Sequence, residues 1–167
     1  MTKEQIKIDN ANLKKILLAG DYASQEEADQ AEVMANKKNI SIGDQLISDG
    51  FLNKDIMGQA IAESKGLPYA DLDAKHPSDE QVKRIPEDIA KKLRVVLFEV
   101  AEKAVTIASD KPTKDLVNRL QSMFPGQKIV IAYADTRDME SVFVHYRKSL
   151  ETEFVKVIKE SDHVAPD

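Results

Sequence analysis

The chain of 167 residues contains no cysteine, which excludes disulfides, zinc–thiolate sites and thiol catalysis. No apolar run approaches the length that spans a bilayer, and the opening sequence MTKEQIKIDN is too polar for a signal peptide. We therefore expect a cytoplasmic protein. No arginine precedes Arg84 and the net charge is −5, which argues against a non-specific nucleic-acid binder. The apolar fraction of 42% is ordinary for a globular chain and sufficient for a core.

Helical periodicity dominates the stretch from Ser41 to Gly66. Apolar residues recur at helical spacing up to Gly50, whose position predicts a C-terminal cap. Asn53 then predicts the N-cap of a second helix, which Gly66 ends. This stretch therefore predicts a helical hairpin, with apolar positions at Ile42, Leu46, Ile47, Ile56, Met57, Ala60 and Ile61.

The preceding stretch shows the same pattern at an offset of 29 residues. Leu17 corresponds to Leu46, and Ser24, a predicted helix cap, corresponds to Asn53. Two helical hairpins in tandem at a fixed period indicate an internal repeat. The alternative is that any two short amphipathic hairpins align equally well.

Beyond residue 70 the periodicity changes from helical to alternating. Val95–Val100 and Val105–Ala108 predict an antiparallel hairpin, and a helix is expected to start at Pro112. The apolar run Lys128–Tyr133 predicts a third strand in the centre of the sheet. The expected fold class is α+β: N-terminal tandem helical hairpins followed by a small three-stranded sheet packed with helices, in the order β-β-α-β-α.

Three segments are expected: a helical subdomain over 1–70, a sheet-containing subdomain over 71–147, and a helical extension with a tail over 148–167. The last helix, capped by Asp135 or Thr136, continues at spacings of three and four past Lys148. We interpret its outer part as a linker or as a helix that binds a partner, including a second copy of this chain. The interaction candidates there are Phe154, Val157 and Ile158.

The sequence contains no recognisable catalytic constellation. It has neither a phosphate-binding loop nor a Gly-x-Gly-x-x-Gly motif. Asp71 and Asp73 form a carboxylate pair without an accompanying nucleophile or base. His145 and Glu140 could together bind a metal ion, but the simpler interpretation is that His145 is a partly exposed histidine on a helix. We expect no enzyme activity, no metal and no resident cofactor.

Several short motifs occur in an order typical of one family. They are Ile42-Gly43, Leu46-Ile47, Gly50-Phe51-Leu52, Met57, Ala60-Ile61, Lys65-Gly66-Leu67-Pro68-Tyr69, Asp71-Leu72, Ile85-Pro86-Glu87-Asp88-Ile89-Ala90 and Arg94-Val95-Val96. The region from Ile42 to Tyr146 resembles the N-terminal domain of type II secretion and type IV pilus assembly ATPases, including the MshEN subgroup that binds cyclic di-GMP. In that family hydrolysis resides in a separate C-terminal domain, which this sequence does not contain, so the resemblance implies no ATPase activity.

The resemblance also implies positions for a cyclic di-GMP site. Each family hairpin carries an arginine and a Leu-Gly at its start, a glycine in its middle and a closing glutamine. Arginine reads a guanine edge in a bidentate manner, and glycine exposes backbone amides to phosphate. In the second hairpin these positions hold Ser41, Gly43, Gly50 and Ser64. In the first they hold Asn12, Lys14, Asp21 and Ala35.

Two functions from different classes follow. Each missing bidentate contact is worth about 1–3 kcal/mol of base discrimination, so the nucleotide site is expected to have decayed. The first interpretation is a non-catalytic module that docks onto a secretion or pilus ATPase, a platform protein or a regulator, through its C-terminal helix or through the helical half near Phe51 and Leu52. The alternative is a cyclic di-GMP receptor with a degenerate motif at Asn12, Lys14, Ser41, Gly43, Gly50 and Ser64.

Overall fold

The computed structural model describes residues 2–146, which divide into two compact units, the first ending at Tyr69 and the second beginning at Ala70. The interaction candidates Phe154, Val157 and Ile158 lie outside the described residues. Within the described part of the chain, no helix combines the length and the hydrophobicity that crossing a membrane requires.

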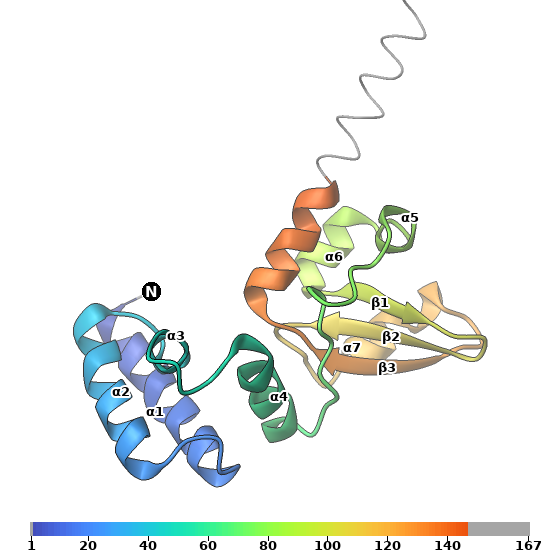
Figure 1. Cartoon of the computed structure of the whole chain (residues 1–167). Helices are drawn as coiled ribbons and strands as arrows, with labels where there is room; N and C mark the ends of the chain where they lie inside the picture. Colours follow the sequence, from blue (N-terminus) through green and yellow to red (C-terminus); the bar gives the residue numbers. More distant parts are fainter. Residues whose placement is uncertain (1, 147–167) are drawn as a thin grey trace, which may run out of the picture. The chain divides into compact units, whose positions relative to one another are not determined.

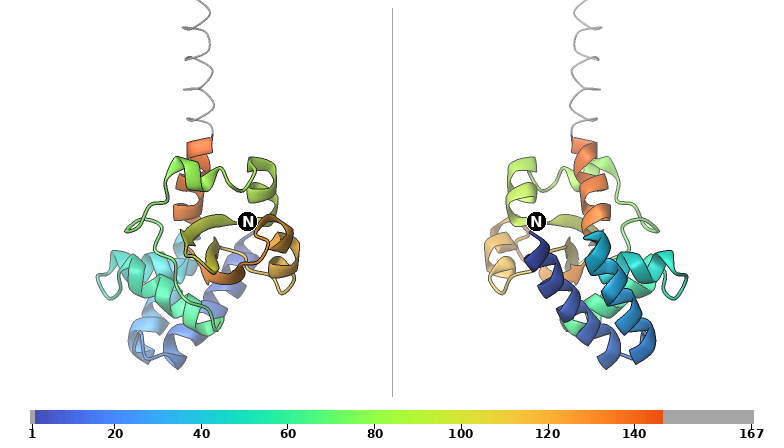
Figure 2. Two further views of the ribbon diagram at one scale, coloured as in Figure 1. Left: turned by 90° about the vertical axis from the view of Figure 1, so that its right-hand side faces the viewer. Right: turned by 90° about the vertical axis from the view of Figure 1, so that its left-hand side faces the viewer.

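Two helical hairpins in tandem make up the first unit, as the sequence predicts. The helices are α1 (Lys3–Ala19), α2 (Gln25–Lys38), α3 (Ile42–Ser48) and α4 (Lys54–Ser64). Each begins at a residue whose side chain accepts a backbone N–H of the first turn, and these caps are Thr2, Ser24, Ser41 and Asn53. Helices α1 and α2 lie side by side (Figures 1 and 2).

The turns inside the two hairpins repeat the same hydrogen bonds 29 residues apart. The Tyr22 amide donates to the Leu17 carbonyl over 2.9 Å, and the Phe51 amide donates to the Leu46 carbonyl over 3.0 Å. Leu17 and Leu46 are both fully buried and belong to one hydrophobic core. The repeated spacing therefore corresponds to repeated backbone geometry.

The second unit contains a small sheet covered by helices, which confirms the α+β class and the β-β-α-β-α order. Its elements are α5 (Asp79–Val82), α6 (Glu87–Leu93), β1 (Val96–Val100), β2 (Ala104–Ser109), α7 (Leu116–Leu120), a 3₁₀ turn (Gln121–Met123), β3 (Lys128–Tyr133) and a helix over residues 136–146 (Figure 1). Its fully buried side chains include Leu97, Ile107, Leu120, Phe124 and Met139.

The strand order corrects one expectation. The order is β1-β2-β3, so β2 is central and β3 is an edge strand. The β1–β2 hairpin is antiparallel, as predicted, with a bulge between Leu97 and Glu99. Strand β3 returns through α7 and pairs with β2 in parallel, from Ala104 opposite Lys128 onward. Because the tight hairpin occupies one edge of β2, β3 takes the other edge whatever its hydrophobicity.

The structure also specifies how three of the helices start. Helix α7 begins at Leu116 and not at Pro112, because the Thr113 hydroxyl donates to Asp115 over 2.7 Å and forms a turn before the helix. Pro86 is the N-cap of α6. Of the two proposed caps of the last helix, Asp135 accepts the backbone N–H of residue 137 over 2.8 Å.

Candidate functional site

Asn10 fixes the start of the second hairpin, where the second set of motif positions begins. Its side chain is 1% exposed and donates to the Asn36 side chain over 2.9 Å and to the Ile40 carbonyl over 3.0 Å. Its oxygen accepts the Ile42 amide over 2.8 Å. One buried amide thus ties α1 to the end of α2 and to the first turn of α3.

Asn10 was not among the sequence candidates, although the sequence carries a signal for it. It occupies the same helical face as Leu13 and Leu17, at i, i+3 and i+7. A polar residue on an apolar face needs buried hydrogen-bond partners, and the loop after α2 supplies them.

Ser41, which stands at the arginine position of the second motif, is an exposed helix cap. Its hydroxyl accepts the Asp44 amide over 2.9 Å. It borders a groove of about 430 Å³ lined by Ile6, Asp9, Asn10, Asn39, Ile40, Ser41 and Asp44. The charged side chains of that lining are both carboxylates, which gives the groove a negative charge.

The two motif glycines, Gly43 and Gly50, serve the fold in different ways. Gly43 is buried in the first turn of α3, where a Cβ would lie 3.1 Å from the Met57 methyl and 3.5 Å from the Leu13 side chain. It lets α3 approach its neighbours closely. Gly50 is exposed with φ of 82°, a left-handed conformation that glycine adopts without strain.

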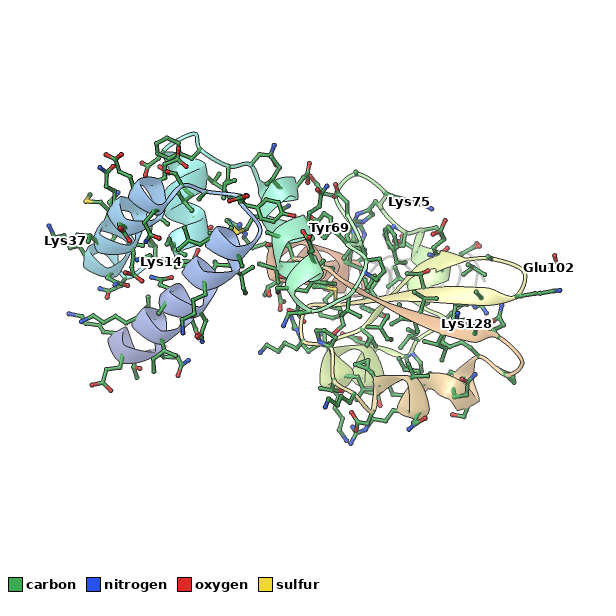
Figure 3. All side chains as sticks on the ribbon, turned by 90° about the horizontal axis from the view of Figure 1, so that it is seen from below. Lys14, Lys37, Tyr69, Lys75, Glu102 and Lys128 are labelled. Atoms are coloured by element: carbon green, nitrogen blue, oxygen red, sulfur yellow. The ribbon has the colours of Figure 1, made fainter. Side chains whose placement is uncertain are left out.

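Lys14 lies between α1 and α2, where it is held by two carboxylates (Figure 3). Its ammonium is 2.5 Å from the Asp29 carboxylate and 3.3 Å from that of Glu32. The hydrogen bond to Asp29 raises the pKa of Lys14 and lowers the pKa of Asp29. Asn12, two residues earlier, is exposed. The charge of Lys14 is therefore already matched within the unit.

Ser64, at the glutamine position, borders a second groove of about 400 Å³. Its hydroxyl donates to the Ile61 carbonyl over 2.6 Å. The groove is lined by Lys15, Ile16, Ala19, Gly20, Tyr22, Ala60, Glu63 and Ser64, and the Tyr22 hydroxyl donates to the Glu63 carboxylate there.

The six candidate positions do not converge on one of these grooves. Ser41 borders the first and Ser64 the second, while Asn12, Lys14, Gly43 and Gly50 line neither. A ligand that touched all six would have to extend along the surface of the helical unit.

In the second unit, Glu140 and His145, the metal pair considered from the sequence, each have a different partner. The Glu140 carboxylate accepts Arg94 Nη1 over 2.7 Å and is not the partner of His145. The neighbour of His145 is His76, from a loop 69 positions earlier. Asp71 accepts the Ala74 amide over 3.0 Å and shapes a turn. Residues 2–146 contain no group of three or more histidine or acidic side chains placed to hold a metal ion.

Comparisons with known proteins place the chain in a family. The family model for the MshEN domain matches residues 66–153, more than half of the chain. No curated protein sequence matches it.

One solved structure gives the same result for the fold. A structure of MshE with cyclic di-GMP matches with a TM-score of 0.52 and 24% identity, over 80% of this chain and 97% of that one. The N-terminal domain of XpsE matches with a TM-score of 0.43 and 12% identity, over 81% of this chain and 94% of that one. The chain therefore belongs to the MshEN domain family and is similar to the N-terminal domains of type II secretion and type IV pilus assembly ATPases.

Proposed function

We propose that this MshEN domain is a non-catalytic regulatory module that acts by binding another protein of a secretion or pilus machine. The observation that carries the proposal is the pairing of Lys14 with Asp29 and Glu32. Lys14 is the one cationic residue among the six motif positions, and its charge is matched by neighbouring carboxylates. A nucleotide phosphate would have to displace them.

The groove beside Ser41 also disfavours a dianionic ligand. Asp9 and Asp44 line it, and the seven lining residues include no lysine or arginine. Two like charges 4 Å apart repel by about 1 kcal/mol even in bulk water. Cyclic di-GMP carries two phosphates, so it would meet repulsion where the family places an arginine.

A cyclic di-GMP receptor is the second candidate. The fold similarity to MshE, whose solved structure contains that ligand, favours it, and so do the retained Gly43 and Gly50. Both glycines have structural roles, however. Gly43 leaves space for the Met57 side chain, and Gly50 forms a left-handed turn. Their presence therefore needs no ligand to account for it.

Calorimetry of the full chain with cyclic di-GMP separates the two candidates. We expect no saturable heat, because the guanidinium groups that read guanine are missing from both hairpins. Saturable heat from the unaltered chain would overturn the proposal. The Gly43→Glu variant is a poor probe, since the new side chain would collide with Met57 and disturb the core.

A gain-of-function variant sharpens this comparison. Asn12→Arg combined with Ser41→Arg restores the family residue at the start of each hairpin. Gln30→Arg combined with Gln59→Arg adds the same charge at exposed positions of α2 and α4 and is the matched control. Heat that appears only in the first variant would mean that the scaffold survives and only the arginines were lost.

The proposal that the domain binds another protein needs a separate experiment. Purified secretion or pilus ATPase is titrated with the full chain and with a variant carrying Phe154→Ala, Val157→Ala and Ile158→Ala. We expect binding to be lost in that variant while its melting curve is retained. Phe51→Ala, at a side chain 50% exposed on the helical unit, tests the competing surface. If only Phe51→Ala weakens binding, the interface lies on the helical hairpins.

A further inference from the structure

Two histidine rings from distant parts of the chain meet in the second unit. His76 lies in the loop before α5, and His145 lies near the end of the helix over residues 136–146. Their Nε2 atoms are 3.0 Å apart, and the ring centres are 4.8 Å apart with a 59° angle between the planes. The two nitrogens that are directed at one another are the atoms through which histidine commonly binds metals.

Asp79 lies beside one histidine of this pair. Its carboxylate lies 3.4 Å from His145 Nδ1, on the far side of the ring from His76. A carboxylate at Nδ1 favours the tautomer with the proton on that atom, so that Nε2 is an acceptor, either for the His76 Nε2–H or for a metal ion. The same carboxylate–histidine arrangement orients histidine ligands in metal sites.

We propose that His76 and His145 form a bidentate site for a first-row divalent transition ion of the zinc type. With metal–nitrogen bonds of about 2.0–2.1 Å, two cis nitrogens lie about 2.9 Å apart at a right angle and about 3.4 Å apart at the tetrahedral angle. The observed 3.0 Å falls within that interval. Imidazole suits zinc, copper and nickel, whereas magnesium prefers oxygen ligands.

The backbone around the pair is held by buried contacts. The Tyr146 hydroxyl, one residue from His145, shares its proton between the carbonyls of Val82 and Ile85, at 2.8 and 2.7 Å. Gln81 Nε2 donates to the Leu97 carbonyl over 2.8 Å and so ties α5 to β1. These contacts hold the elements on the His145 side of the pair, and the two rings are already 3.0 Å apart, which lowers the cost of binding an ion.

The surroundings limit the strength of the site. No third histidine or acidic ligand joins the pair within the described residues, so the remaining coordination positions are open to water or to a donor from another molecule. Lys83 lines the same small hollow as Asp79 and His145, and Lys75, labelled in Figure 3, forms an ion pair with Glu99 over 2.8 Å. With two protein ligands and open coordination positions, the site should be weak and not permanently occupied.

Calorimetry with zinc chloride on the untagged, chelator-treated full chain tests the inference. We expect one ion per chain, loss of saturable binding in His76→Ala and in His145→Ala, and about tenfold weaker binding in Asp79→Asn. His163→Ala is the matched control, because His163 is the remaining histidine and is outside the proposed pair; its zinc binding should be unchanged. Magnesium chloride should give no saturable heat.

A second measurement avoids reliance on variants that fold poorly. In nitrogen NMR of the unaltered chain, zinc should shift the Nε2 resonances of His76 and His145 together. Absence of saturable zinc binding, binding that survives in both alanine variants, or resonance changes confined to His163 would each overturn the inference. The result does not depend on whether the helical hairpins bind a nucleotide, because all three residues belong to the second unit.

Discussion

Asp21 and Gly50, 29 residues apart, occupy the same position in the two helical hairpins and share a left-handed backbone, with φ of 57° and 82°. Each follows a helix whose last turn is closed by equivalent hydrogen bonds, from the Asp21 amide to the Leu18 carbonyl and from the Gly50 amide to the Ile47 carbonyl. The first hairpin thus has the shape of the second at a position that holds aspartate instead of glycine.

This pair predicts opposite effects for two substitutions. Asp21→Gly relieves the left-handed conformation and should raise the free energy of unfolding by about 0.5 kcal/mol, because part of the gain is offset by the freedom of glycine in the unfolded chain. Gly50→Ala introduces the same strain and should lower it by about 1 kcal/mol. Urea denaturation of both variants measures the difference, and a destabilised Asp21→Gly protein would contradict the interpretation.

Asn10→Ala should be one of the most damaging changes in the helical unit. It leaves the Ile42 amide and the Ile40 carbonyl without their buried partner, at a cost of about 1–3 kcal/mol for each group. We expect a loss of about 3 kcal/mol in chemical denaturation. Asn12→Ala, the same change at an exposed position of α1, is the control and should stay within about 0.5 kcal/mol of the parent.

Arg94→Met should destabilise the sheet unit. Arg94 holds the Asp110 carboxylate through Nε at 3.1 Å and Nη2 at 2.6 Å, and the Asp110 side chain is 0% exposed. Removing the guanidinium leaves a buried charge without its partner, which costs about 3–5 kcal/mol. Thermal denaturation should show this loss, whereas Arg119→Met, which breaks an exposed pair with Asp115, should cost less than about 1 kcal/mol.

Two buried tyrosines predict a loss of stability at alkaline pH. Burial raises the pKa of Tyr133 and of Tyr146 to about 12. The folded protein therefore holds these protons more tightly than the unfolded chain, whose tyrosines titrate near pH 10. Their contribution is complete below about pH 10 and is lost as the pH rises to about 12, by up to about 1.4 kcal/mol per pH unit for each residue.

The free energy of unfolding measured between pH 9 and pH 12 checks this prediction. The double variant Tyr133→Phe and Tyr146→Phe should give a flatter profile, although Tyr146→Phe also removes the hydrogen bonds to Val82 and Ile85 and lowers stability at neutral pH. A parent profile as flat as that of the variant would show that the phenols ionise equally in both states.

Sequence reasoning worked best where one residue acts on its own neighbours. Ser24 and Asn53 cap α2 and α4, and Gly50 closes the turn between α3 and α4, because these hydrogen bonds span three or four positions. The edge position of β3 was missed for a different reason. Hydrophobicity does not order strands when a hairpin already occupies one side of β2.

In the candidate site, too, local features were predictable from the sequence and long-range contacts were not. Motif spacing named Ser41, Gly43 and Gly50 correctly as parts of a hairpin, but the sequence could not show that Met57 packs against Gly43 or that Asp29 and Glu32 hold Lys14. Which of these positions contact a ligand stays a prediction, and so do the roles of Phe154, Val157 and Ile158.

By itself the sequence determined the helical hairpins, the α+β order and the family, because caps, periodicity and turn residues act over a few positions. Only the tertiary structure decided that Asn10 reaches Ile42, that Arg94 finds Asp110 and that His76 meets His145, over separations of 32, 16 and 69 residues. Such contacts depend on how complete elements pack, and that packing is a property of the whole unit and not of any short stretch.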